Sequence, residues 1–182
     1  MAGDLLPTGT FQDLPKRHLT TTSCEVWGYH CNTFKGSPCQ VADYRDAQGI
    51  LVAQKVRFVD KSFVILGDAR SIGLYGKHRC REGGKRVVIT EGEIDAISVS
   101  QIQDHKWPVL SIPNGAQGAK KAIQADLEFL ESFEEVILCF DNEPRNKEIV
   151  RRMEKAVNDG WKVLFWPSHV DGKVANKMIE NG

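Results

Sequence analysis

Residues 87–95 have the sequence VVITEGEID, residues 138–143 have the sequence LCFDNE, and these two stretches decide the fold. Each begins with a run of apolar or β-branched residues, which is typical of a strand buried on both faces of a parallel sheet. Each run leads into acidic residues: Glu91, Glu93 and Asp95 in the first stretch, and Asp141 and Glu143 in the second. Ligands of open parallel sheets bind at the carboxyl ends of the strands, so the two stretches predict an acidic site at one sheet edge.

The sequence around these stretches alternates short apolar runs with segments of helical spacing. The predicted strands are Arg86–Thr90, Pro108–Ile112, Glu135–Phe140 and Lys162–Trp166, and the predicted helices are Glu93–Gln103, Ala116–Ser132 and Pro144–Asp159. Strands that alternate with helices of this length indicate βαβ units and a parallel sheet. We therefore expect residues 86–182 to form an α/β domain with helices flanking the sheet.

Residues 11–85 differ from the rest of the chain. Gln40–Arg45 and Ile50–Arg57 have strand character and are separated by a turn that ends in Gly49, and Ser62–Leu66 is a candidate third strand. This part is expected to form a small α+β subdomain built on a hairpin or meander. Residues 1–10 are rich in Gly, Pro and Thr, and we expect them to form a loose leader or tail.

Composition and charge place the chain among ordinary globular proteins. Of its 182 residues, 41% are hydrophobic and 26% are charged, no apolar run is long enough to cross a bilayer, and no signal peptide is evident. We therefore expect a cytoplasmic protein with no membrane partner. The net charge is zero, but residues 1–86 carry thirteen Lys/Arg against eight Asp/Glu, and the remainder carries eleven against sixteen. A basic half beside an acidic half suits a phosphate-binding surface next to a divalent-metal site.

The cysteines and histidines do not indicate a zinc site. The five cysteines contain no CxxC pair, and the five histidines are scattered along the chain. We expect the thiols to be reduced and mostly buried, and we expect no zinc in this chain.

The acidic residues suit a different kind of metal. Asp141 and Glu143 are two residues apart and point to the same side of an extended chain, and Asp95 lies one helical turn after Glu91. Converging carboxylates bind hard cations such as Mg²⁺ or Mn²⁺. The alternative is that these acids are solvated loop residues or helix caps. Their recurrence after two strands favours the metal site.

These stretches resemble a known family. VVITEGEID and LCFDNE are similar to the two signature motifs of the Toprim (topoisomerase–primase) domain. Upstream, QVADYRD at 40–46, QKVR at 54–57, GKH at 76–78 and GGK at 83–85 resemble the polymerase domain of bacteriophage primase–helicases. The resemblance covers roughly residues 11–182. It implies a Toprim-like parallel sheet with flanking helices, preceded by a small basic α+β subdomain.

The resemblance also implies an activity and a set of site residues. The expected activity is DNA-directed synthesis of short RNA primers from NTPs on single-stranded DNA, with Mg²⁺ or Mn²⁺, in the host cytoplasm during phage replication. The resemblance implies that Glu91, Asp141 and Glu143 are catalytic, and that these three residues and Asp95 bind the metal. The expected nucleotide- or DNA-binding residues are Lys55, Arg57, Lys77, Asn114, Gly115 and Lys120. The alternative for Lys55 and Arg57 is an exposed strand face.

The sequence shows neither the zinc-binding module that primases of this kind use nor a helicase P-loop. The expected partners are therefore a replicative helicase, in cis or in trans, and a zinc-binding primase module. Two alternative functions remain open: a non-catalytic Toprim module that binds nucleic acid, and a Toprim-type metal-dependent nuclease. The basic segment Gln54–Arg57 favours the primase, because the nuclease has no use for it.

Two positions depart from the family pattern. The usual Asp-x-Asp pair is Asp141-Asn142-Glu143 here, and the usual Lys-Asp-x-Asn segment is Lys173-Val174-Ala175-Asn176. Val174 therefore replaces an expected acid, which puts the catalytic competence of the chain in question.

If Val174 weakens a metal site, Val174→Asp will raise the rate of primer synthesis, because a carboxylate adds a ligand for a hard cation. The rate is measured with labelled NTPs on a single-stranded template. An unchanged rate would show that Val174 does not limit the activity.

Overall fold

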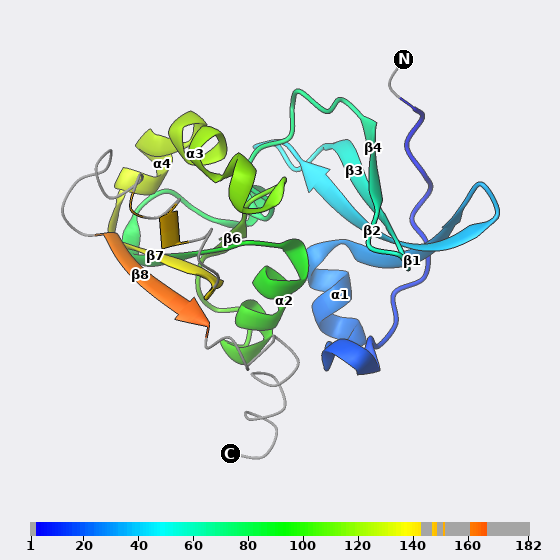
Figure 1. Cartoon of the computed structure of the whole chain (residues 1–182), viewed down its shortest axis with the longest axis horizontal. Coiled ribbons are helices and arrows are strands. Elements are labelled where there is room, and N and C mark those ends of the chain that lie inside the picture. Colours follow the sequence, from blue (N-terminus) through cyan, green and yellow to red (C-terminus); the bar gives the residue numbers. More distant parts are fainter. Residues whose placement is uncertain (1–2, 143–146, 149–150, 152–160, 167–182) are drawn as a thin grey trace.

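The structure is a computed structural model of the whole chain, and it describes residues 3–142, 147, 148, 151 and 161–166. These residues form two four-stranded sheets with helices packed around them (Figure 1). The first sheet contains the amino-terminal strands, and the second contains the strands that carry the two acidic stretches.

The first sheet is an antiparallel meander whose strands follow one another in chain order. The strands are β1 (Tyr29–Phe34), β2 (Ser37–Arg45), β3 (Leu51–Phe58) and β4 (Phe63–Gly67). The expected α+β meander is confirmed, although β1 was not predicted. A short helix η1 (Pro15–Arg17) and α1 (Thr21–Trp27) precede it. Thr20 caps α1 by accepting a hydrogen bond from the backbone N–H of Ser23.

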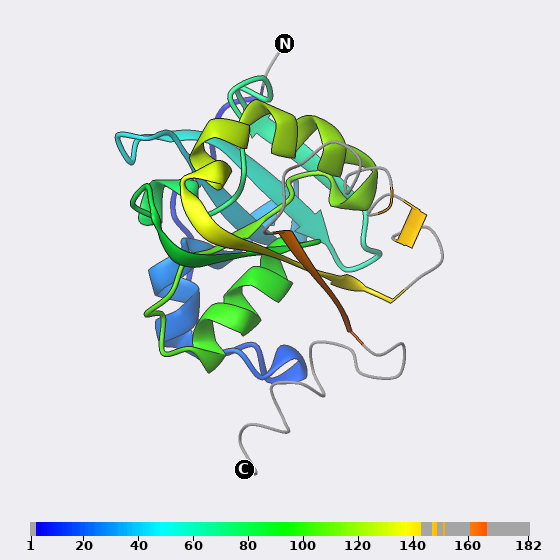
Figure 2. The ribbon, with the colours of Figure 1, turned by 90° about the vertical axis from the view of Figure 1, so that its left-hand side faces the viewer.

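The second sheet is wholly parallel, with the strand order β6-β5-β7-β8. Its strands are β5 (Gly84–Thr90), β6 (Val109–Ser111), β7 (Phe133–Asp141) and β8 (Trp161–Trp166), and its helices are α2 (Glu93–Ile102), α3 (Gly115–Ala125) and α4 (Leu127–Glu131). Figures 1 and 2 show α3 and α4 on one face of this sheet and α2 on the other. The predicted Toprim-like α/β arrangement is confirmed.

The expected single helix Ala116–Ser132 is wrong, because it is interrupted at Asp126. The Asp126 carboxylate forms an ion pair with Lys77, which belongs to the short helix η2 (Lys77–Arg79). Asp has low helix propensity because its side chain competes for nearby backbone groups, and a distant cation here holds that side chain. The helix expected at Pro144–Asp159 lies largely outside the described residues.

Two of the three apolar cores among the described residues pack against helices α2, α3 and α4. One lies between the second sheet and helices α3 and α4, and includes Leu138, Ile123 and Leu130. The other lies between α2 and the first sheet, and includes Ile97 and Tyr44. The second core crosses the boundary expected near residue 85, so the first sheet packs directly on the helix that follows the first acidic stretch.

The expectation of a loose leader does not hold for residues 3–10. The buried Gln54 amide accepts a hydrogen bond from the Leu6 N–H at 2.7 Å and donates one to the Leu6 carbonyl at 3.1 Å. Thr10 forms a bridge to Cys31, and Gly67 donates to the Gly3 carbonyl. A buried amide must find partners, and the leader supplies them for Gln54. The segment is therefore ordered against the first sheet.

Other expectations concern single residues. All five cysteines are free thiols, and Cys24, Cys39 and Cys139 are buried. Trp27 and Tyr29 pack in the core between α2 and the first sheet. Within the described residues, no helix has the length and apolar character of a membrane span.

The close approach of Gly76 to the buried Trp27 ring gives a test of the packing in this core. Its φ is +86°, and an added Cβ would lie 2.5 Å from Cζ3 of the Trp27 ring. Gly36 also has a positive φ, of +80°, but its Cβ would meet nothing within 4 Å. We expect Gly36→Ala to cost roughly 1 kcal/mol from backbone strain, and Gly76→Ala to cost about 2 kcal/mol more from overpacking. Urea unfolding measures both, and equal losses would contradict the contact with Trp27.

Candidate active site

The turn after β5 is built to place acidic side chains at the sheet edge. The Thr90 hydroxyl lies 3.1 Å from the Gly92 carbonyl and 3.2 Å from the Leu110 carbonyl, so it links the turn to β6. Gly92 is the N-cap of α2, and a Cβ there would lie 3.0 Å from Oδ2 of Asp95. Glycine therefore allows the chain to enter α2 close to the Asp95 carboxylate.

Three of the predicted acids gather at this edge. Burial raises the pKa of Asp95 from 3.8 to about 7, and the carboxylates of Asp141 and Glu91 add to the increase. Burial, followed by the charges of Asp95 and Asp141, raises the pKa of Cys139 to about 12. Negative charge is therefore concentrated where β5 and β7 end, and a divalent cation would relieve this repulsion.

The loop between β6 and α3 lies beside Glu91. Gly115 has a φ of +62°, and a Cβ there would lie 3.9 Å from Oε1 of Glu91. Asn114 is exposed at the N-cap of α3, and Lys120 is exposed further along that helix. The structure thus brings Asn114 and Gly115 to the acidic edge. Their predicted contact with a nucleotide stays a prediction.

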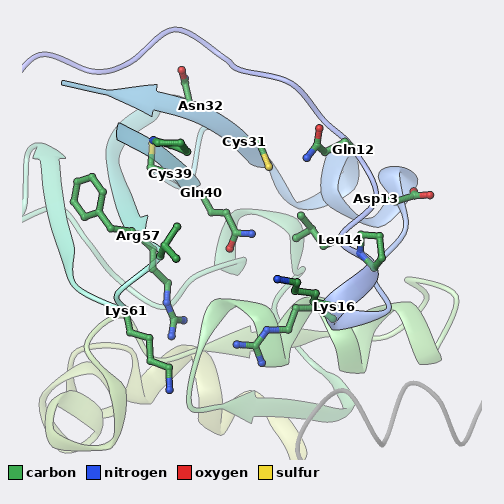
Figure 3. Close-up of a pocket in the computed structure, with 15 residues that line it drawn as sticks. Gln12, Asp13, Leu14, Lys16, Cys31, Asn32, Cys39, Gln40, Arg57 and Lys61 are labelled. Atoms are coloured by element: carbon green, nitrogen blue, oxygen red, sulfur yellow. The ribbon is translucent and has the colours of Figure 1, made fainter. Parts of the chain in front are cut away.

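A groove of about 690 Å³ opens beside the first sheet, between the segment 12–17 and strands β1 to β3. Its lining includes cations from two separate elements: Lys16 and Arg17 of η1, and Arg57 and Lys61 of β3 and its following turn. Figure 3 shows Lys16, Arg57 and Lys61 extending toward the same region of the groove. The positive charge of Arg17 offsets a small part of the increase in the pKa of Asp95, so the groove is within electrostatic reach of the acidic edge.

Two of the predicted nucleotide-binding lysines are engaged in ion pairs. Lys55 Nζ lies 2.9 Å from Oε1 of Glu93, and Lys77 is paired with Asp126. Asp126 follows the last residue of α3, whereas Gly115 at the acidic edge is its first residue. Lys77 is therefore at the far end of α3 from the acids. The nucleotide-binding roles of both lysines stay predictions.

The remaining predicted acid, Glu143, lies outside the described residues, as does Val174. In the part of the chain that the structure describes, no three His, Cys, Asp or Glu side chains lie close enough together to enclose a metal ion. The chemistry of the donors nevertheless suits Mg²⁺ or Mn²⁺, because Glu91, Asp95 and Asp141 offer only oxygen ligands and repel one another.

Several residues of this site were not identified from the sequence. Lys16 and Lys61 are far apart in the chain and share no motif, so only the fold brings them into one groove. Glu93 belongs to the first acidic stretch, but the sequence predicted no role for it. Its burial and its contacts with Tyr44 and Lys55 come from the first sheet, which no local pattern reveals.

Comparison with known proteins defines first a class and then a family. Residues 88–178, half of the chain, match the family described as Toprim-like. Residues 9–67 match the family described as bacteriophage T7 DNA helicase/primase, N-terminal a+b fold. A parallel sheet with acids at its edge, joined to this second unit, is the architecture of a Toprim primase.

The relatives make the assignment more specific. The DNA helicase/primase of Enterobacteria phage T3 is 40% identical over 152 residues, which are 84% of this chain and 27% of that protein. The crystal structure of the primase fragment of the bacteriophage T7 primase-helicase protein superposes with a TM-score of 0.90 and 34% identity, covering 99% of this chain and 76% of that one. The chain belongs to the T7-type phage primase family. It spans about a quarter of the length of the curated relatives it matches.

A more distant likeness concerns the fold alone. A DNA primase domain from Pseudomonas aeruginosa has a TM-score of 0.64 at 15% identity, covering 91% of this chain and 66% of that one.

The pKa of Asp95 gives a testable dependence on pH. The folded-state pKa is above the unfolded value, so the folded protein binds this proton more tightly. The unfavourable charge is fully present above pH 7 and is relieved as the pH falls toward 4. We expect Asp95→Asn to raise the free energy of unfolding at pH 8 by about 1–3 kcal/mol without divalent cations.

The gain from Asp95→Asn should largely disappear at pH 4, which urea unfolding at both pH values will measure. Asp104→Asn, at an exposed position, is the matched control and should change little at either pH. Destabilisation by Asp95→Asn at pH 8 would show that the carboxylate is favourably placed, contrary to this account.

Proposed function

We propose that this chain catalyses DNA-directed synthesis of short RNA primers from NTPs on single-stranded DNA, as part of phage DNA replication. One observation carries the proposal: the charges of Glu91 and Asp141 act on Asp95 beside a glycine-bearing loop, and Arg17 of a basic groove is within electrostatic reach of the same carboxylate. The membership in the T7-type primase family supports it.

The acidic edge supplies the chemistry. Glu91, Asp95 and Asp141 are the described residues that would hold Mg²⁺ or Mn²⁺, and Glu143 is a further proposed ligand. When bound, such a cation lowers the pKa of an attacking hydroxyl and neutralises the leaving pyrophosphate. Glu91 accepts the proton of the primer 3′-hydroxyl. The 3′ oxygen then forms a bond to the α-phosphorus of the incoming NTP, and the bond to pyrophosphate breaks.

The loop and the groove hold the substrates. Asn114 and Gly115 lie next to Glu91, where the N-terminus of α3 presents backbone N–H groups to an anion. Lys120 on the same helix is proposed to contact the NTP phosphates. Arg57, together with Lys16 and Lys61, is proposed to contact the phosphates of the template, which positions the strand without reading its sequence.

The proposed partners are single-stranded DNA, NTPs, a replicative helicase in cis or in trans, and a zinc-binding primase module. In a T7 structure, the primase domains of two gp4 subunits interact with the lagging-strand DNA polymerase and are bound to an RNA/DNA hybrid and dTTP. That chain is 34% identical to the present one, which covers 93% of it. This supports a nucleic-acid partner for the groove described above.

A Mg²⁺- or Mn²⁺-dependent assay with labelled NTPs on a single-stranded template tests the proposal. The wild type should make labelled oligoribonucleotides, and Glu91→Gln should lower their yield by about a hundredfold or more, because it removes the proton acceptor and a ligand. Glu128→Gln, at an exposed position on α4, is the matched control and should leave the yield unchanged.

Each other outcome of this assay selects an alternative. Shortening of the DNA strand, lost in Glu91→Gln, would indicate the metal-dependent nuclease. If the template binds but is neither copied nor cut, the chain is a non-catalytic nucleic-acid-binding module.

A further inference from the structure

A buried acid connects the two sheets next to the proposed active site. Glu93 is the first residue of α2, lies midway between Glu91 and Asp95, and is only 5% exposed. The Tyr44 hydroxyl donates a hydrogen bond of 2.5 Å to its Oε1 atom, and the Lys55 ammonium donates one of 2.9 Å to the same atom. Both donors belong to the first sheet.

Lys55 also holds the loop between β6 and α3. Its Nζ atom donates a second hydrogen bond, of 2.7 Å, to the carbonyl of Pro113. Pro113 immediately precedes Asn114 and Gly115, the loop residues beside Glu91. One ammonium group from β3 therefore holds the beginning of α2 and the approach to α3 at the same time.

The surroundings of Lys55 leave it little capacity for a further ligand. Its side chain is 12% exposed. An ammonium has three hydrogens, and Glu93 and Pro113 accept two of them. The Phe63 ring lies 4.7 Å from Nζ and provides a cation–π contact. A substrate phosphate would have to compete with contacts that are already short and largely desolvated.

Lys55 and Glu93 form a buried ion pair in which each residue depends on the other. A buried charge that loses its partner remains desolvated and uncompensated, which is why removing one member of a buried pair is costly. Loss of Lys55 would leave Glu93 charged between Glu91 and Asp95, where the local charge is already negative. The start of α2 would then move to hydrate Glu93, and the neighbouring acids would move with it.

We propose that Lys55 and Tyr44 are positioning residues, which act on the reaction through Glu93 and the Pro113 carbonyl and do not bind the nucleotide directly. The first sheet is thereby part of the catalytic apparatus in addition to forming a basic groove. For the reaction itself, this inference rests on the proposed primer synthesis.

The test compares Lys55→Met with Glu93→Gln in the primer-synthesis assay, with kcat and the KM for NTP measured separately. Each substitution should lower kcat by about tenfold or more and change KM less than about twofold, because the ground-state contacts of the nucleotide are left intact. The double variant should be no slower than the worse single variant, since both changes break the same contact.

A second readout does not depend on catalysis. Hydrogen exchange of the backbone amides of residues 112 and 114–118 should accelerate in Lys55→Met, and in Glu93→Gln to a smaller extent, because only the first variant also loses the bond to Pro113. Lys106→Met, an exposed lysine paired with Asp104, is the matched control and should change neither exchange nor kcat. Tyr44→Phe, a milder change, covers the case in which Lys55→Met does not fold.

The outcomes separate this inference from the proposed function. If Lys55→Met raises KM severalfold while Glu93→Gln does not, Lys55 contacts the nucleotide and the inference is wrong. Unchanged exchange in folded Lys55→Met would also overturn it. A wild type that makes no primers would contradict the proposed function alone, because the exchange measurements would still decide whether Lys55 holds the loop.

Discussion

In the second sheet, β5 pairs in parallel with β7 so that Thr90 lies opposite Cys139. This register brings the residues after both strands to one edge, and the charges of Glu91, Asp95 and Asp141 interact there although up to fifty residues separate them in the chain. The parallel arrangement requires crossovers, and those that join β5, β6 and β7 contain the helices that cover the sheet in the described residues. The accumulation of like charge at the edge is therefore a consequence of the topology, and it carries a cost in folding stability.

The first sheet offsets part of that cost. It packs on α2 through an apolar core, and it contributes Tyr44 and Lys55 to the buried carboxylate of Glu93. Three carboxylates thus lie within residues 91–95, and that of Glu93, which faces the first sheet, forms an ion pair with Lys55. The first sheet also borders a basic groove, whose cations come from η1 and from β3 with its following turn. The two units of the chain are joined by electrostatic complementarity as well as by apolar contact.

Local patterns predicted most of this fold, and their failures have a common origin. The strands of the second sheet and helix α2 were predicted within a few residues, because continuous apolar runs and helical spacing are local signals. The predicted helix Ala116–Ser132 failed at Asp126, where a lysine forty-nine residues away forms an ion pair. The loose leader was wrong because Gln54 is buried beneath it. In each case, a contact distant in sequence overrode a local preference.

By itself, the sequence determined the parallel sheet and the acids at its edge, because the periodicity of a strand is a property of neighbouring residues, and the resemblance of two short motifs to a known family added the Toprim-like class. The tertiary structure alone decided which charges meet. It placed Lys55 against Glu93, Lys77 against Asp126, and the cations of η1 beside those of β3. Charged side chains are long and their pairing depends on distance and burial, which only the folded chain defines.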